Sequence, residues 1–156
     1  MPPEIIVSTH VHTDGPIPGP HSLLTLAAAA HLADGGTTTE NVTQFAATLR
    51  ELPGATPHPT TLQDWRSRPE EWLRTRRGSR PPALVATDLL RWVESLPAPP
   101  VLATDHGPDH LFLYWYLQRF TGRWPFDRVS VDPAHRMDAA GTCVLDGCRS
   151  SVVRAA

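Results

Sequence analysis

The sequence predicts an α/β domain in which helices flank a mixed sheet, and two observations support this. The first 50 residues contain β-branched and alternating segments separated by Gly- and Pro-rich turns, a pattern typical of antiparallel strands. The rest of the chain alternates helical periodicity with short apolar runs, which indicates helices and further strands. The chain has 156 residues, 40% of them hydrophobic, so it can bury one ordinary core and we expect a single domain.

Charge and cysteine content limit the function classes. The formal net charge is -2 and all 14 basic residues are arginine, so a nucleic-acid binder with a broad basic surface is disfavoured and any phosphate contact must be local. Cys143 and Cys148 alone provide neither a disulfide framework nor a four-ligand zinc site. The N-terminus lacks a basic region, and no apolar stretch approaches the ~20 residues of a membrane span. We therefore expect a cytoplasmic chain without a membrane partner.

The segment from Ile5 to Gly19 carries the strongest chemical signal. A β-branched run continues into an alternating His-Val-His-Thr-Asp segment and stops at a Gly/Pro turn, which predicts a strand that ends in a loop. Alternation places His10 and His12 on one face, with Asp14 as a further member if the strand continues that far. Imidazoles and a carboxylate suit zinc, manganese or a similar cation and also transfer protons. The alternative is that the two histidines only line a half-exposed strand end.

Two further strands are expected to complete an antiparallel meander. Residues 21–30 form the second strand, because turns flank them, although the alanine run within them also favours a helix. The Asp34-Gly35-Gly36 sequence predicts a hairpin, because glycine adopts positive φ at little cost. Alternation in residues 41–46 then predicts the third strand.

A helical segment follows the meander. Residues 53–59 form a loop, Thr60 is a suitable N-cap for residues 61–77, and Pro69 is expected to split that segment into two short helices. Cations are favourable at a helix C-terminus, and a phosphate contact is the alternative role for the arginines that gather there. These arginines are Arg74, Arg76, Arg77 and Arg80.

The second half of the chain predicts helix, strand, helix and strand. Pro81-Pro82 begins a helix that extends to about Leu96, and its apolar residues form one stripe. Residues 99–104 form a short buried strand, after which Asp109 caps the helix over residues 110–120. That helix is apolar almost all round, so we expect it to be largely buried and its aromatic residues to belong to the core.

The end of the chain carries less information. Residues 129–132 are a candidate last strand, and residues 139–156 lack clear periodicity. We therefore expect a domain over residues 1–138 and an irregular tail over residues 139–156.

The order of three antiparallel strands, helices, strand, helix and strand is that of a ribonuclease H-like domain. Several motifs over residues 5–132 resemble a bacterial branch of the DEDD-type (DEDDh-like) 3'-to-5' exonucleases. They are Asp14-Gly15-Pro16-Ile17-Pro18-Gly19, Leu52-Pro53-Gly54-Ala55, His58-Pro59, Trp65, Pro69-Glu70, Trp72, Arg80-Pro81-Pro82, Phe112-Leu113-Tyr114-Trp115-Tyr116-Leu117, Arg119-Phe120 and Pro125-Phe126. The resemblance implies a ribonuclease H-like fold, nucleic acid as partner, and Mg²⁺ or Mn²⁺ as cofactor.

The sequence departs from that family at its acidic motifs. The family's first strand carries an Asp-x-Glu pair that holds two divalent metals, and His10 and His12 stand at these positions. Asp109 matches the second acidic position. His135 is followed by Asp138 and by no aspartate five residues on, so the third motif is not matched. The candidate catalytic and metal-binding residues are therefore His10, His12 and Asp109.

These departures predict altered chemistry. Magnesium prefers oxygen ligands, and a two-metal phosphodiesterase must neutralise charge on the attacking and leaving oxygens, whereas histidine brings no negative charge. The three residues suit one softer cation such as Zn²⁺. We expect an exonuclease-like nucleic-acid-processing domain with impaired catalysis. Because the family's last helix is not matched, we also expect exposed apolar surface and self-association into a homo-oligomer.

Two alternatives belong to other function classes. One is a non-catalytic interaction module that uses the aromatic helix. The other is a His-rich metal-dependent phosphoesterase, because His10-Val11-His12 with Thr104-Asp105-His106 resembles the metal motifs of polymerase-and-histidinol-phosphatase enzymes. Barrels of that kind need ~200 residues or more, which exceeds this chain.

Overall fold

A five-stranded mixed sheet forms the centre of the molecule. The computed structural model describes residues 4–34, 37–104 and 109–131. The strands are β1 (Glu4–Thr13), β2 (Leu23–Asp34), β3 (Thr37–Thr48), β4 (Val101–Thr104) and β5 (Arg128–Val131), and they lie in the order β3-β2-β1-β4-β5. β1, β2 and β3 are antiparallel neighbours, while β4 pairs in parallel with β1 and with β5. The predicted meander with two further strands is confirmed.

β2 and β3 are longer than the sequence analysis predicted. β2 spans 12 residues and includes the alanine run, in which Ala28 and Ala30 contribute to the core. β2 is hydrogen-bonded on both sides, to β1 and to β3, so pairing with two strands overrides the helical propensity of alanine. The predicted strands were too short, because the alternation of apolar and polar residues is lost where small and polar residues continue a strand.

Four helices complete the described part of the chain. They are α1 (Pro59–Arg66), α2 (Pro69–Arg76), α3 (Pro82–Glu94) and α4 (Asp109–Thr121). The predicted division at Pro69 is confirmed. The predicted N-cap is wrong: His58 is the cap, and its Nδ1 accepts a hydrogen bond of 3.3 Å from the Thr60 backbone N–H. The helix begins earlier than predicted, at Pro59. Proline is favourable at the first helical position because the backbone N–H that it lacks would have no partner within the helix.

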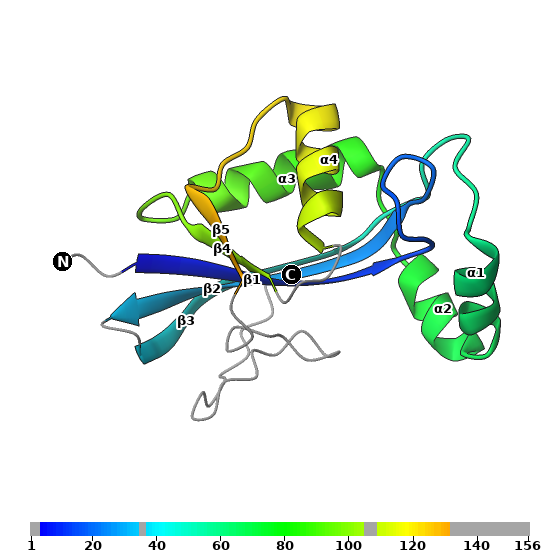
Figure 1. Cartoon of the computed structure of the whole chain (residues 1–156), viewed down its shortest axis with the longest axis horizontal. Helices are drawn as coiled ribbons and strands as arrows, with labels where there is room; N and C mark the ends of the chain where they lie inside the picture. Colours follow the sequence, from blue (N-terminus) through cyan, green and yellow to red (C-terminus); the bar gives the residue numbers. More distant parts are fainter. Residues whose placement is uncertain (1–3, 35–36, 105–108, 132–156) are drawn as a thin grey trace.

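The core lies between one face of the sheet and the pair α3 and α4 (Figure 1). From β1 it receives Ile5 and Val7, and from α4 it receives Phe112, which is fully buried. Tyr116 fixes α4 to the sheet, because its hydroxyl accepts a hydrogen bond of 2.7 Å from the Leu23 N–H. Burial raises the pKa of Tyr116 well above its usual value, so this hydroxyl remains neutral.

The expectation that α4 is largely buried holds for one face only. Leu111 is 50% exposed and Tyr114 is 52% exposed, whereas the opposite side of the helix is buried. Apolar residues on every face of the sequence segment predicted a helix that is buried on every face. In the structure, neighbouring elements cover only one side of α4.

Several predictions fall on other parts of the chain. The last strand begins one residue earlier than predicted, at Arg128. Other predictions lie outside the described residues, namely those that involve Asp105, His106, Asp132, His135 and the tail over residues 139–156. The barrel alternative is wrong, because the described strands form an open sheet in which β3 and β5 are the edges. Among the described helices none is long and apolar enough to span a bilayer.

Candidate functional site

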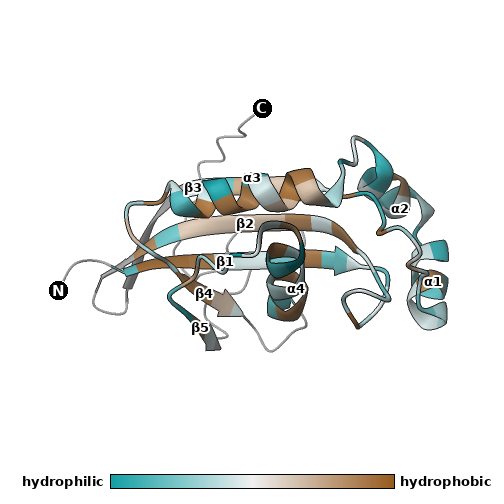
Figure 2. Cartoon of the chain, turned by 90° about the horizontal axis from the view of Figure 1, so that it is seen from above, coloured by the Kyte–Doolittle hydropathy of each residue, from teal (hydrophilic) through white to brown (hydrophobic). Residues whose placement is uncertain are grey.

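His10 and His12 lie near the end of β1 and face away from the main core. Ile5 and Val7 point into the core, so alternation places the even-numbered residues of β1 on the opposite face. Figure 2 shows that β1 is hydrophobic in its first half and more polar toward its end. The two rings meet edge to face with centroids 4.9 Å apart, and both side chains are half-buried. The predicted shared face of the two histidines is confirmed.

The two imidazoles converge on one point. Their Nε2 atoms are 3.3 Å apart, which permits one hydrogen bond between them when one ring donates. The same separation fits a shared cation: zinc–nitrogen distances of ~2.0–2.1 Å in a tetrahedral site place two nitrogens about 3.3 Å from each other. The separation of the two nitrogens therefore matches that of two ligands of one tetrahedral ion.

Burial favours the metal-binding form of His12. Burial, and then the neighbouring His10, lower the pKa of His12, while the Glu71 carboxylate raises it and the Arg68 guanidinium lowers it. The ring is therefore neutral near pH 7, which is the form that binds a metal. Arg68 is the N-cap residue of α2 and Glu71 lies in the first turn of that helix.

Trp65 holds α1 against the end of β1. It is 4% exposed, its ring packs 5.7 Å from that of His12, and its Nε1 donates a hydrogen bond of 3.3 Å to the Thr13 carbonyl. Trp72 of α2 packs against Trp65 with ring centroids 5.6 Å apart. The short helices are thus fastened beside the histidines.

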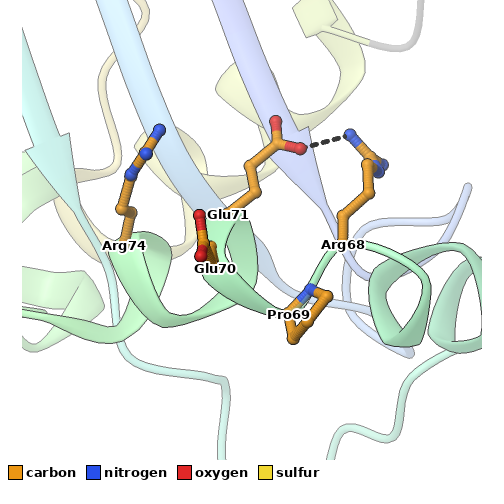
Figure 3. Close-up of a pocket in the computed structure, with 5 residues that line it drawn as sticks. All are labelled: Arg68, Pro69, Glu70, Glu71 and Arg74. Atoms are coloured by element: carbon orange, nitrogen blue, oxygen red, sulfur yellow. Dashed lines mark hydrogen bonds and ion pairs between the residues drawn. The ribbon is translucent and has the colours of Figure 1, made fainter.

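An open pocket of about 460 Å³ lies on α2 (Figure 3). The Cζ atom of Arg68 lies 4.8 Å from the centre of the Trp65 ring, and Arg68 Nη1 forms an ion pair of 2.8 Å with Glu71 Oε2. Both charged side chains are partly exposed, at 47% and 38%. Arg68 of this pocket therefore lies against Trp65, and Trp65 in turn packs against His12. The lining residues of the pocket are Arg68, Pro69, Glu70, Glu71 and Arg74.

Asp14 does not extend the row of histidines, so that expectation is corrected. β1 ends at Thr13, and its register shifts between His12 and Thr13. The Asp14 carboxylate is buried, and its Oδ1 accepts a hydrogen bond of 2.6 Å from the Ser22 N–H. Its carbonyl accepts another, of 2.7 Å, from the His58 N–H. Asp14 therefore joins the turn after β1 to the segment before α1.

Asp109 lies at the same end of the sheet as the histidines. β1 and β4 are parallel, with Ser8 opposite Ala103, so both strands end at this edge, and α4 begins at Asp109. Across the described ranges, no group of three or more His, Cys, Asp or Glu side chains converges to hold a metal. The structure therefore brings His10 and His12 together and does not add Asp109 to them.

The sequence pattern alone assigns no site role to Trp65, Arg68 or Glu71. Their proximity to His12 depends on the packing of α1 and α2 against β1, which lies more than 50 residues away in the chain. One local signal was available: Trp65 precedes an Arg–Glu pair at i, i+3 on either side of the Pro69 break.

The fold was compared with known proteins. No family model matches the chain, and no curated protein matches it. Among solved structures, a zinc-bound complex of E. coli exonuclease I with single-stranded DNA is similar, with a TM-score of 0.58, 12% identity, and coverage of 82% of this chain and 28% of that one. E. coli exonuclease I with an oligonucleotide gives a TM-score of 0.57, 13% identity, and coverage of 85% and 28%. S. pombe Pop2p in its Mg²⁺- and Mn²⁺-bound form is similar with a TM-score of 0.51 and 13% identity. The match covers 78% of this chain and 55% of Pop2p.

The chain has the ribonuclease H-like fold. This confirms the predicted fold class, and identities of 12–13% support likeness of fold alone. The chain spans about a quarter of the length of exonuclease I and about half that of Pop2p.

Proposed function

We propose that this chain is an exonuclease-like domain that binds nucleic acid and has lost most of the family's Mg²⁺-dependent hydrolysis. The observation that carries the proposal is the histidine pair at the end of β1 in a ribonuclease H-like fold. By resemblance, His10 and His12 occupy the positions of the family's first carboxylate pair. E. coli exonuclease I, which has a similar fold, is known in complex with single-stranded DNA, and this supports a single strand as the ligand.

The donor set does not fit the magnesium chemistry of the resembled family. Magnesium binds oxygen ligands and requires negative charge around it, whereas the two groups that converge are imidazole nitrogens 3.3 Å apart. We therefore assign no catalytic step to a pair of magnesium ions in this chain.

One softer cation suits the residues better. In this proposal His10 and His12 hold a single divalent ion, for which nitrogen ligands favour Zn²⁺ over Mg²⁺ or Mn²⁺. Asp109, at the same end of the sheet, is the acidic residue that the resemblance implies for the site. The half-buried His12 is neutral near pH 7 and needs no proton removed before it binds. Similar folds carry zinc in exonuclease I, and magnesium and manganese in Pop2p.

Two assays on the full chain test the proposal. Fluorescence anisotropy with labelled single-stranded DNA and RNA, and with a duplex of the same sequence, measures binding. We expect single strands to bind and the affinity to fall with salt, since phosphate contacts release counterions. A gel assay with the same oligonucleotides in Mg²⁺ and in Mn²⁺ measures hydrolysis, and we expect intact oligonucleotide.

Each part of the proposal has its own refutation. Absence of binding at about 100 μM protein, the weak end of non-specific binding, would overturn nucleic acid as the ligand. Robust digestion that disappears in Asp109→Asn would overturn the loss of hydrolysis and make the chain an active exonuclease. Asp88→Asn is the control for that variant, because Asp88 is a surface aspartate of α3 that forms an ion pair with Arg80.

A further inference from the structure

Residues 50–80 carry a local excess of positive charge. This segment contains seven arginines and four acidic residues, a net charge of +3, in a chain whose formal net charge is -2. It begins just after β3 and includes α1 and α2, and Figure 2 shows hydrophilic residues over much of both helices. Because the guanidinium group keeps its charge at physiological pH, this part of the surface attracts anions.

Two arginines of this segment neutralise carboxylates beside it. Arg76 Nη1 lies 3.0 Å from Glu51 Oε1, and Arg80 Nη2 lies 2.6 Å from Asp88 Oδ2. Each pair is neutral as a whole, so these two carboxylates do not repel an anion that approaches the neighbouring arginines.

Arg50, Arg74 and Arg77 form no ion pair within the described ranges, and all three side chains are exposed. Figure 3 draws an ion pair at Arg68 and none at Arg74. Cations are favourable at a helix C-terminus without any ligand, which accounts for Arg74 and Arg77 but not for Arg50, since Arg50 lies outside the helix. These three residues are the arginine surface.

Backbone contacts place Arg50 and Arg77 on adjoining segments. Arg77 is the C-cap of α2, and Gly78 follows it with a φ of 64°, a left-handed conformation that favours glycine and ends the helix. The Arg77 carbonyl accepts a hydrogen bond of 3.2 Å from Thr48 Oγ1. The Arg50 N–H donates one of 2.9 Å to the Arg80 carbonyl. The turn after α2 therefore lies alongside the residues that follow β3.

Arg74 belongs to the same surface through α2. It lies three residues before Arg77, and positions three apart share one side of a helix, ~4.5 Å apart along its axis. The three guanidinium groups are exposed and come from two chain segments, so they suit a ligand with several separate anionic groups. The phosphodiester backbone of a nucleic acid is such a ligand, and the guanidinium fork matches phosphate oxygens.

The arginine surface lies at the same end of the molecule as the histidine pair. Trp72 of α2 packs against Trp65 with ring centroids 5.6 Å apart, and Trp65 packs against His12 at 5.7 Å. Figure 1 shows α1 and α2 together beyond the end of β1. A strand bound near the histidines therefore has α2 beside it.

We propose that Arg50, Arg74 and Arg77 bind the phosphate backbone of single-stranded nucleic acid. This inference rests on the proposed function, because it names the surface that receives the ligand proposed there. Phosphate contacts carry no sequence information, so binding at this surface is independent of base sequence. A chain with a net charge of -2 thus binds a polyanion through one local group of unpaired cations.

Fluorescence anisotropy of the full chain with labelled oligothymidylate, over a range of salt concentrations, tests this surface. The buffer contains EDTA, so no metal ion contributes to binding. For a single strand, each phosphate contact contributes about 0.7 to the slope of log K against log salt concentration. Arg50→Gln with Arg77→Gln should therefore lower the slope by ~1.4 and weaken binding by tenfold or more at about 50 mM salt. Addition of Arg74→Gln should lower the slope by a further ~0.7.

Arg91→Gln with Arg119→Gln is the matched control, because it changes the net charge equally. These arginines lie on α3 and α4, are exposed, and form no ion pair in the described part of the chain. Salt screens charges distant from the ligand, so we expect an unchanged slope and an affinity within about threefold of the wild type. Far-UV circular dichroism checks folding, and the hydrogen bonds at Arg50 and Arg77 use backbone atoms that the substitutions keep.

The outcomes separate this inference from the proposed function. If the wild type binds the oligonucleotide and the Arg50/Arg77 double variant behaves like the control, the arginine surface is wrong and nucleic acid stands as the ligand. If the wild type binds no nucleic acid, the proposed function and the arginine surface are both wrong. If polyglutamate displaces the oligonucleotide as well as unlabelled oligothymidylate does, the surface binds acidic polymers in general and its assignment to phosphate is wrong. Loss of affinity and slope in the Arg50/Arg77 double variant alone supports the inference.

Discussion

Replacing Trp65 with phenylalanine tests how the two short helices are fixed beside β1. Trp65 is 4% exposed, and its Nε1 donates a hydrogen bond of 3.3 Å to the Thr13 carbonyl at the last residue of the strand. Phenylalanine keeps an aromatic ring against His12 and Trp72 and removes the donor. A lost hydrogen bond costs ~0.5–1.5 kcal/mol, and more if the carbonyl is left unpaired, so we expect Trp65→Phe to lower the free energy of unfolding by about 1–2 kcal/mol.

Urea denaturation followed by far-UV circular dichroism measures this change. With a slope of ~2 kcal/mol per molar urea, typical of small proteins, the midpoint should fall by about 0.5–1 M. Trp72→Phe is the control, because Trp72 packs on Trp65 from α2 and its ring is only half-buried. Trp72→Phe removes less buried apolar area, so we expect it to lower the free energy of unfolding by less than about 1 kcal/mol. A midpoint for Trp65→Phe equal to that of the wild type would refute the anchoring role of this hydrogen bond.

Three further predictions concern a buried acid, the core and catalysis. Burial raises the pKa of Asp14 above its unfolded value of 3.8, so the stability that it contributes is present at low pH and falls as pH rises through the folded pKa. The unfolding free energy of Asp14→Asn relative to wild type should therefore increase between about pH 4 and 7, as measured by urea titration. Phe112→Ala should cost ~3–5 kcal/mol and the exposed Leu111→Ala under ~1, by the same method. His10→Asp with His12→Glu should not restore Mg²⁺-dependent digestion in a gel assay, since the third acidic motif is not matched.

Most of the fold could be predicted from local patterns. The apolar stripe of α3, the break at Pro69 and the turns around β1 depend on residues close together in the chain, so spacing alone predicts them. Predictions failed where partners distant in the chain decide the structure. The alanines of β2 form a strand because β1 and β3 pair with it on both sides, and α4 exposes Leu111 because its neighbours pack along one side only.

The sequence predicts only the part of the site that lies on one strand. His10 and His12 share a face because side chains alternate along a strand, and that rule needs no tertiary information. The same rule misplaces Asp14, because the register shift after His12 ends the alternation and the carboxylate is used to hold the turn. Arg68 lies over the ring of Trp65, which packs against His12, and a linear pattern does not encode these contacts.

The charge of the proposed ion determines what it can do. A single dication held by the two neutral imidazoles of His10 and His12 keeps its positive charge and attracts a phosphate. Two-metal hydrolysis needs positive charge on both the attacking and the leaving oxygen, and one ion supplies it at one position only. The charge of the proposed site therefore agrees with the proposed role, in which the domain binds nucleic acid and hydrolyses little of it.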